Sequence, residues 1–502
     1  MRNKNNNPVI IGIAQRTQRK NVSKPLDPLS LMLQTSKCAL EDTNVEAIET
    51  YIDSIYMVNI RSWSYEDAPG LLGKELKIQP KCKVYLPDGG NTPQMLVNRA
   101  ARKILNDSNT VILITGGECG YSAYRRDKEF IEKNWPEKKA PKYMEGPLWN
   151  GINDFENSYR LYSPVYTYAL FETAFRASIN SPINDHLKKI GELFEKFSRV
   201  AAKNPFAWKK ELYQAEDIVK VSKINRMISY PYNKLMCSNL YVDQSASLII
   251  TSDVFANQLE VSKDKWVYLM GSADFENVFE VLQRPNLYDS PAAREGAKFA
   301  LTQAGLSLNQ IDLFDIYSCF PSIVQIIRNE LGIKEDDPRD LTITGGLPYF
   351  GGPWSNYSLH AIVTAVERIR NNHSLKIMIA ANGGYNTKQS FGIYGRNSQK
   401  NLKSKNEEEL IQKSILDKSL PPPIEQAKGY MTVKGYTIPF NREGGPFKGI
   451  VIGEFEDHRR TLALLDIDDN ILHKLTNQEF VGKKVRVYYD NKTKYNKLIF
   501  SL

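Results

Sequence analysis

The chain has 502 residues, of which 42% are hydrophobic and 25% charged, and its formal net charge is +9. This length exceeds what a single hydrophobic core supports, and the composition fits a soluble globular protein, so two to four domains are expected. The modest basic excess fits solubility alone, or a patch for an anionic partner such as a coenzyme A phosphate or nucleic acid.

The cysteines and histidines exclude several classes of protein. The five cysteines include no CxxC pair, and the five histidines show no ligand-like spacing. This pattern argues against a disulfide framework and against a structural zinc site, so no metal is predicted. No signal-peptide-like segment or long apolar run is present, so we expect a cytoplasmic protein without a membrane span.

The first half of the chain alternates strand-like and helix-like segments. Residues 9–14 form a short apolar run typical of a buried strand, and residues 28–40 are predicted to be a helix with Asp27 as its N-cap. A strand over 52–60, a helix over 91–105 and a strand over 110–117 follow.

Residues 120–225 interrupt this alternation with charge clusters, aromatic residues and prolines, which predicts an inserted loop domain. Regular alternation resumes near residues 239–252. The first half is therefore assigned to residues 1–255, with the loop domain inserted at about 120–225.

The second half, residues 256–398, repeats the first. Ser290-Pro291 opens a helix as Asp27-Pro28 does, and residues 313–317 form the matching strand. Gly351-Gly352 corresponds to Gly89-Gly90, and each pair precedes a predicted helix and then a strand. Weak similarity at this spacing indicates a duplicated α/β unit with helices packed on sheets.

The C-terminal part differs from the two halves in its sequence pattern. Residues 399–425 are polar and contain Pro421-Pro422-Pro423, which predicts a linker. Residues 426–502 contain short strand-like runs without long helices and are predicted to form a small all-β domain.

Six segments in order resemble the thiolase superfamily, and more closely the type-1 thiolase-like proteins related to sterol-carrier-protein-type thiolases. The segments are residues 9–15 (VIIGIAQ), 89–94 (GGNTPQ), 234–239 (KLMCSN), 317–321 (YSCFP), 344–353 (TGGLPYFGGP) and 382–385 (NGGY). The resemblance implies a duplicated thiolase fold, layered αβαβα with an inserted loop domain, and an additional OB-like domain at the C-terminus.

The resemblance also implies where catalytic residues should stand, and this sequence departs from the family at each place. Active thiolases use a cysteine at a helix N-terminus, a histidine, an asparagine and a second cysteine. Those positions fall at Gly90 (or Gly89, if the alignment slips by one), Gly352, Tyr317 and Ala381. Glycine cannot form an acyl-enzyme, so ordinary Claisen condensation or thiolysis is not expected.

Other residues are candidates for binding or residual chemistry. The resemblance implies that the backbone N–H groups of Gly90 and Gly383 point at the former oxyanion hole, and Asn382, Tyr317, Ser318 and Gly352 would border a bound substrate. Cys319 is a candidate nucleophile, or a small buried residue. His360 is a candidate base, or a histidine satisfied on its helix.

The resemblance implies an acyltransferase of the acetyl-CoA acetyltransferase kind, acting on coenzyme A thioesters in lipid metabolism. The missing residues favour a second hypothesis, a non-catalytic binder of coenzyme A thioesters or lipids. A third is binding of nucleic acid or another partner by the basic, aromatic tail, although Lys and Tyr are common throughout the chain, and nucleic acid is not the favoured partner. No cofactor besides the coenzyme A ligand is implied, and the chain is expected to be a monomer or a homodimer.

Overall fold

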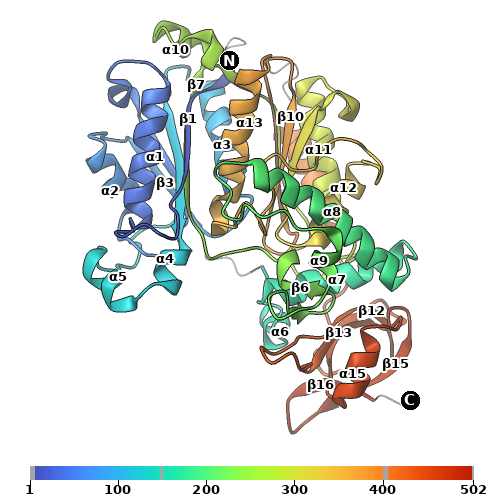
Figure 1. The fold of residues 1–502 in the computed structure, drawn as a ribbon. Coiled ribbons are helices and arrows are strands. Elements are labelled where there is room, and N and C mark those ends of the chain that lie inside the picture. Colours follow the sequence, from blue (N-terminus) through green and yellow to red (C-terminus); the bar gives the residue numbers. More distant parts are fainter. Residues whose placement is uncertain (1–5, 147–150, 399–404, 500–502) are drawn as a thin grey trace.

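A computed structural model describes residues 6–146, 151–398 and 405–499. Within these ranges one nine-stranded sheet runs through both halves (Figure 1). Its strands, in spatial order, are β3 (Cys82–Leu86), β2 (Ser54–Val58), β4 (Ile112–Cys119), β7 (Asp243–Ser252), β1 (Pro8–Thr17), β8 (Val267–Glu276), β11 (Lys388–Gly395), β10 (Ile377–Gly383) and β9 (Leu313–Ile316). The halves join where β1 pairs with β8 over only two residues of β1, Val9 and Ile10.

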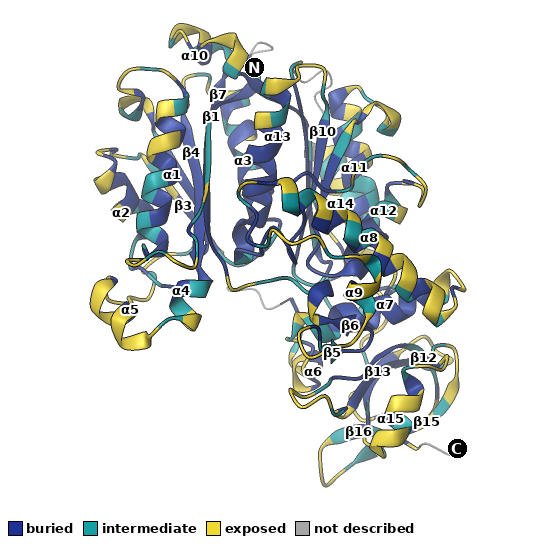
Figure 2. Cartoon of the chain, viewed as in Figure 1, coloured by how far each residue is buried: buried dark blue, intermediate teal, exposed yellow. Residues whose placement is uncertain are grey.

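The helices form three layers around this sheet, which gives the expected αβαβα order. Two helices, α3 (Thr92–Asn106) and α13 (Tyr357–Asn371), lie in the centre between the halves. The outer helices are α1 (Pro28–Asp42) and α2 (Ala68–Glu75) on the first half and α11 (Pro291–Ala304) and α12 (Pro321–Glu330) on the second. Figure 2 shows the consequence, because the central helices are buried along most of their length while the outer helices expose one face.

The two halves repeat each other in local detail. Asp27 caps α1 by accepting hydrogen bonds from Leu29 N and Ser30 N, and Ser290 caps α11 by accepting one from Ala293 N. A Cβ built on Gly12 of β1 would lie 2.2 Å from the carbonyl oxygen of Ala39. A Cβ built on Gly271 of β8 would lie 2.0 Å from that of Ala300. Both halves therefore use glycine to bring strand and outer helix together at the same place.

The inserted region is largely helical. It contains α4 (Gly120–Arg125), α5 (Lys128–Asn134), α6 (Asp154–Ser158), α7 (Pro164–Ser178), α8 (Ile183–Lys203), α9 (Ala215–Val219), β5 (Met227–Ser229), β6 (Tyr232–Asn233) and η2 (Lys234–Met236). The remaining short elements are α10 (Asp253–Gln258), η1 (Ile48–Tyr51), η3 (Lys263–Lys265), η4 (Val281–Gln283), η5 (Leu308–Gln310) and η6 (Trp354–Asn356). The long α7 and α8 lie beside the second half of the core (Figure 1).

The C-terminal residues form a closed five-stranded barrel, consistent with the expected OB-like domain. Its strands, in order, are β12 (Gly429–Thr437), β13 (Gly449–Glu454), β14 (Arg460–Leu465), β16 (Tyr495–Ile499) and β15 (Lys484–Asp490), and α15 (Asp469–Leu475) precedes β15. The segment predicted as a linker carries a helix, α14 (Lys405–Leu416). Gln412 ties α14 to β8 by two hydrogen bonds with the backbone of Glu276.

The barrel docks on the loop domain and on the core through hydrogen bonds between side chains and backbone atoms. The Thr173 hydroxyl of α7 donates to the carbonyl of Tyr436 at 2.9 Å and accepts from its N–H at 3.0 Å. Arg460 is only 3% exposed and donates to the carbonyls of Arg284 and Pro285 on the core. These contacts fix the barrel against both the insertion and the second half. Across the described ranges, no helix is both long and apolar enough to cross a membrane.

Candidate functional site

The two Gly-Gly turns meet at the N-terminal ends of the central helices. Gly89 and Gly90 precede α3, and Gly351 and Gly352 precede η6 and α13. The N–H of Gly89 donates to the Ser355 hydroxyl at 3.0 Å, and the Ser358 hydroxyl donates to the carbonyl of Gly90 at 2.6 Å. The structure therefore brings both turns into one site between the halves.

At Gly90, the space for a side chain is already occupied. A Cβ built there would lie 2.2 Å from the Tyr317 hydroxyl oxygen and 2.5 Å from the carbonyl oxygen of Asn382. Gly90 is not among the glycines with a positive φ, so lack of space rather than backbone strain requires glycine here. The resemblance put the nucleophilic cysteine at this position, and the neighbouring residues leave no room for one.

Tyr317 is the residue that closes the position. It follows β9, and its N–H donates to the carbonyl of Ala380 at 2.9 Å, which fixes its backbone beside β10. Its ring meets the Tyr357 ring edge-on, with centroids 5.6 Å apart. Burial raises the pKa of the Tyr317 phenol well above its usual range, so the hydroxyl stays protonated and acts as a neutral hydrogen-bonding group.

Gly352, the expected histidine position, is closed in the same way. A Cβ built there would lie 2.2 Å from the Ser238 hydroxyl oxygen. The N–H of Gly352 donates to the carbonyl of Asn239 at 2.9 Å, which holds residues 238 and 239 against the turn. Ser318 is fixed nearby, because its hydroxyl accepts from the N–H of Leu347 at 3.2 Å. Ala381, the expected second cysteine, is buried within β10.

Gly383 and Asn382 end β10 beside Gly90. A Cβ on Gly383 would lie 2.4 Å from Asn91 Oδ1 and 3.2 Å from the Gly90 nitrogen, so Gly383 and Gly90 are neighbours. Asn382 donates to the Tyr168 hydroxyl at 2.8 Å and accepts from Gln389 at 2.8 Å. Its side chain is thus engaged by the protein on both sides and holds β10, β11 and α7 together.

Cys319 is buried and is a poor nucleophile in this environment. Burial raises the pKa of its thiol to about 12, and a hydrogen bond with Tyr168 offsets only part of that effect. A thiol with this pKa is almost wholly protonated near neutral pH. Its carbonyl accepts from the N–H of Ser238 at 3.0 Å, so its backbone supports the segment that fills the histidine position.

His360 lies within α13 and faces the first half instead of Cys319. Its Nδ1 shares a hydrogen bond with Gln15 Oε1 at 3.0 Å, and its ring packs on Phe350 at 5.2 Å. Burial lowers the pKa of His360 to about 3, which keeps the ring neutral. No hydrogen bond joins His360 to Cys319 in the part of the chain that the structure describes, so the two form no nucleophile–base pair there.

Two residues at the site were missed by the sequence analysis. Tyr168 of α7 stacks on Phe320 with ring centroids 5.0 Å apart, and its hydroxyl accepts from Asn382 and from the N–H of Asn386. Lys209 lies 5.5 Å from the centre of the Tyr349 ring, and burial lowers its pKa to about 8. Both lie in the inserted region, where no motif marked them.

Several buried polar atoms around the turns have no hydrogen-bond partner from the described protein. They are Asn91 Oδ1, Ser238 Oγ, Gln244 Oε1, Tyr349 Oη, Asn356 Oδ1 and His360 Nε2. Buried polar groups in folded proteins are almost always satisfied by protein, water or ligand. This concentration suits a site that receives polar groups from water or a ligand. No cluster of His, Cys, Asp and Glu among the described residues could hold a metal ion.

Similarity to solved structures defines the fold class of the core. A human mitochondrial 3-ketoacyl-CoA thiolase, solved in complex with CoA, is 14% identical and covers 79% of this chain and 98% of its own, with a TM-score of 0.54. The human sterol carrier protein 2 is 20% identical over 180 residues, which span 34% of this chain and 32% of that protein, about a third of its length. The core is therefore a thiolase fold.

The particular family follows from two closer matches. Residues 410–492 match the thiolase-like protein type 1 additional C-terminal domain. A monomeric SCP2-thiolase-like protein type 1 from Mycobacterium smegmatis is 30% identical, covers 99% of each chain and has a TM-score of 0.84. This chain belongs to the type-1 thiolase-like proteins.

Proposed function

We propose that this chain binds a coenzyme A thioester, or a related acyl lipid, without cleaving it by the thiolase route. The observation that carries the proposal is the Tyr317 hydroxyl in the space that a side chain at residue 90 would need. A nucleophile at that position would have to displace both Tyr317 and the carbonyl of Asn382. An acyl-enzyme at residue 90 is therefore excluded on steric grounds as well as by the absence of a thiol.

Binding of a thioester is supported by the fold and by the site's unsatisfied polar atoms. A thiolase of the same fold was solved with CoA bound. Ser238 Oγ, Asn91 Oδ1 and Tyr349 Oη lie near the two turns and have no hydrogen-bond partner among the described protein groups. A thioester ligand carries amide and carbonyl groups that could supply them. The backbone N–H groups of Gly90 and Gly383 remain the proposed donors to its carbonyl.

The competing proposal is an acyltransferase that uses Cys319 as its nucleophile. The Tyr168 hydroxyl at the thiol is the feature that favours it. Against it stand the raised pKa of Cys319 and the orientation of His360 toward Gln15. Without a nearby base, deprotonating this thiol is costly, so we favour binding without catalysis.

One experiment separates these proposals. The protein is incubated with acetyl-CoA and longer acyl-CoAs radiolabelled in the acyl group, and bound ligand, covalent label and released CoA are measured. We expect saturable binding without covalent label or turnover. Label that disappears in Cys319→Ala, but persists in Cys38→Ala as the matched control, would establish the acyltransferase instead. Absence of any binding would refute both.

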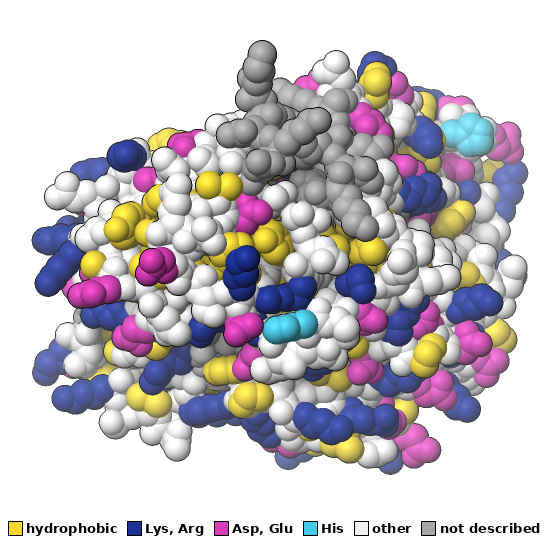
Figure 3. Space-filling model, turned by 90° about the horizontal axis from the view of Figure 1, so that it is seen from above, with side chains coloured by type: hydrophobic (Ala, Val, Ile, Leu, Met, Phe, Trp, Pro, Cys, Tyr) yellow, Lys and Arg dark blue, Asp and Glu magenta, His cyan; other side chains and the backbone are white. Residues whose placement is uncertain are grey.

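We further propose that the protein is a monomer in the cytoplasm and does not bind nucleic acid. The M. smegmatis relative is described as monomeric. All five cysteines are free, as expected in a reducing compartment. On the barrel, Lys484 is paired with Glu456 and Lys497 with Asp490, which neutralises part of its basic surface. The upper face in Figure 3, at the end of the molecule away from the barrel, also has intermixed basic and acidic side chains. Light scattering would test the mass, and titration with a single-stranded oligonucleotide would test the third hypothesis.

A further inference from the structure

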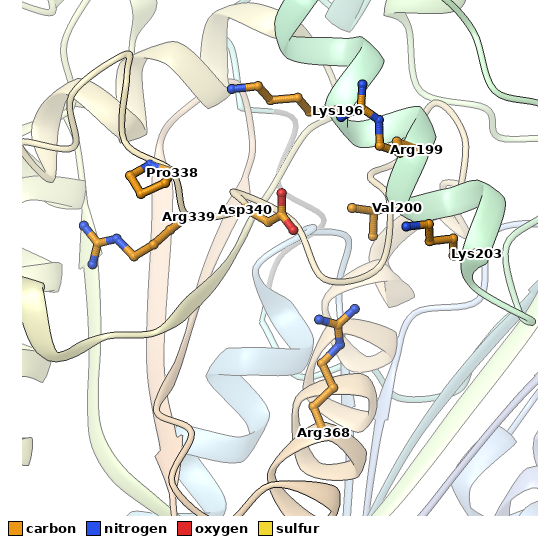
Figure 4. A pocket seen from close by; sticks show the side chains of 8 residues that line it. All are labelled: Lys196, Arg199, Val200, Lys203, Pro338, Arg339, Asp340 and Arg368. Atoms are coloured by element: carbon orange, nitrogen blue, oxygen red, sulfur yellow. The ribbon is translucent and has the colours of Figure 1, made fainter.

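A cavity of about 420 Å³ opens between α8, the loop before Thr342 and α13 (Figure 4). Five basic residues line it with a single acid, Asp340; they are Lys196, Arg199, Lys203, Arg339 and Arg368. The cavity lies apart from the former catalytic site. Arg368 is eleven residues after Tyr357, which places it about 16 Å further along α13 from the Gly-Gly turns.

The lining charge is only partly neutralised by neighbours. Arg199 pairs with Glu195 at 2.7 Å, and Arg339 pairs with Asp337 at 2.6 Å and points away from the cavity (Figure 4). Lys196, Lys203 and Arg368 have no acidic partner within the described ranges. With the Arg339–Asp337 pair set aside, four cations face two anions, Glu195 and Asp340, so the cavity keeps an excess of positive charge.

The geometry brings these cations together from separate elements. Positions 196, 199 and 203 recur at three- and four-residue spacing, so they lie on one face of α8. Arg368 points from α13 toward the space beneath α8 and Asp340, and its guanidinium donates to the carbonyl of Ile343 at 3.2 Å. That bond uses one of its five donors, and the fork remains available to an anion.

A second cavity, toward the N-terminal end of α8, carries a smaller excess of positive charge. Four basic residues line this cavity of about 690 Å³, and three of them are paired with acids: Lys188 with Glu192, and Lys189 and Arg328 both with Glu335. Like charges gathered without partners repel one another, and a bound anion removes that repulsion. The excess positive charge of the first cavity therefore favours the binding of an anion.

We propose that the cavity lined by Lys196, Lys203 and Arg368 binds a small molecule through a phosphoryl group that carries at least two negative charges. Phosphoryl oxygens accept hydrogen bonds from several directions, which suits lysines on α8 and a guanidinium on α13. The cavity volume is in the range of small-molecule sites. Inorganic pyrophosphate carries no acyl group, so its binding here does not require a thioester at the Gly-Gly turns, and either proposal can fail without the other.

The test uses the full chain and radiolabelled inorganic pyrophosphate in equilibrium dialysis at low ionic strength. We expect saturable binding that weakens with added salt. Arg368→Gln and Lys203→Gln should each lower the affinity about tenfold, the loss expected for one charge-assisted hydrogen bond. Asp340→Asn should raise the affinity, because it removes the one lining carboxylate. Lys188→Gln, on the same helix beside the second cavity, is the matched control and should change nothing.

Several results would overturn the proposal. They are the absence of saturable binding, an equal loss in Lys188→Gln, or weaker binding in Asp340→Asn. Binding to phosphatidic acid vesicles or to an oligonucleotide without binding to pyrophosphate would also overturn it. The site would then recognise a membrane surface or a nucleic acid and not a small molecule. Lys203 is exposed at the end of α8, so Lys203→Gln decides the matter even if Arg368→Gln fails to fold.

Discussion

The hydroxyl of Tyr317 stands 2.2 Å from the point where a side chain on Gly90 would begin. These two residues, distant in sequence, hold the places that the family resemblance gives to an asparagine and a nucleophilic cysteine. Their departures from the thiolase pattern are thus physically linked, since the larger residue occupies the space left by the smaller one. Restoring a cysteine alone would not restore the site.

The first prediction concerns Gly90→Ala. The added methyl would overlap the Tyr317 ring and the backbone carbonyl of Asn382, so we expect a loss of about 1–3 kcal/mol in the free energy of unfolding. Urea denaturation measures it. Gly89→Ala is the matched control, because its Cβ would meet only the side-chain ends of Asn91 and Thr92 at 2.8 Å, which can move. Equal losses in both variants would contradict the steric argument.

The second prediction concerns thiol reactivity. With a pKa of about 12, the Cys319 thiol has on the order of one part in ten thousand as thiolate at pH 8. We expect iodoacetamide to leave it unmodified while it alkylates the exposed Cys38 on α1. Peptide mass spectrometry under native conditions measures both in one sample. Comparable rates at the two cysteines would show that Cys319 is activated.

The third prediction concerns pH and Glu118, which is buried at the end of β4 and accepts from the N–H groups of Arg61 and Ser62. Burial raises its pKa from 4.5 to about 7. Because the unfolded chain loses this proton at lower pH than the native chain does, Glu118 makes stability fall as pH rises from about 4.5 to 7. The fall is at most about 3 kcal/mol.

Glu118→Gln tests this directly. Denaturation of both proteins at several pH values should show wild type losing stability relative to the variant across that window, with a constant difference above it. A difference that does not depend on pH would show that Glu118 titrates normally. Glu66→Gln is a suitable control for the method, because Glu66 lies at the surface in an ion pair with Lys142.

The fourth prediction concerns barrel docking. Arg460→Met removes two donors to the carbonyls of Arg284 and Pro285 and leaves those oxygens buried without this partner, so we expect a loss of roughly 2–3 kcal/mol. Limited proteolysis should also cut the segment between core and barrel faster. Arg459→Met is the matched control, because Arg459 is half exposed and pairs only with Asp457 beside it. If both variants behave alike, the buried arginine does not hold the barrel.

Local signals in the sequence predicted much of the fold. The caps Asp27 and Ser290 and the apolar runs located α1, α11, β1 and β9, because capping and burial act within a few residues. The α14 helix was missed, since its polar sequence resembles a linker and its position depends on contacts with β8.

The site was less predictable, because its geometry depends on distant pairs. Gly90 and Gly352 could be recognised as departures from a motif, but Tyr317 and Ser238 fill their space only in the folded chain. His360 looked like a candidate base on its helix, and only the fold turns it toward Gln15. Tyr168 carried no sequence signal, because its role comes from where α7 packs.

Helix α7 has consequences for how the domains communicate. On this helix, the carbonyl of Leu170 packs closely against Gly435 of the barrel, and the Thr173 hydroxyl forms hydrogen bonds with the backbone of Tyr436. The Tyr168 hydroxyl of the same helix forms hydrogen bonds with Asn382 and Cys319. A ligand that displaced Tyr168 would have to work against the hydrogen bonds at the barrel. Because Thr173 and Tyr168 belong to the same helix, the hydrogen bonds to the barrel also help to hold the Tyr168 hydroxyl beside Asn382 and Cys319.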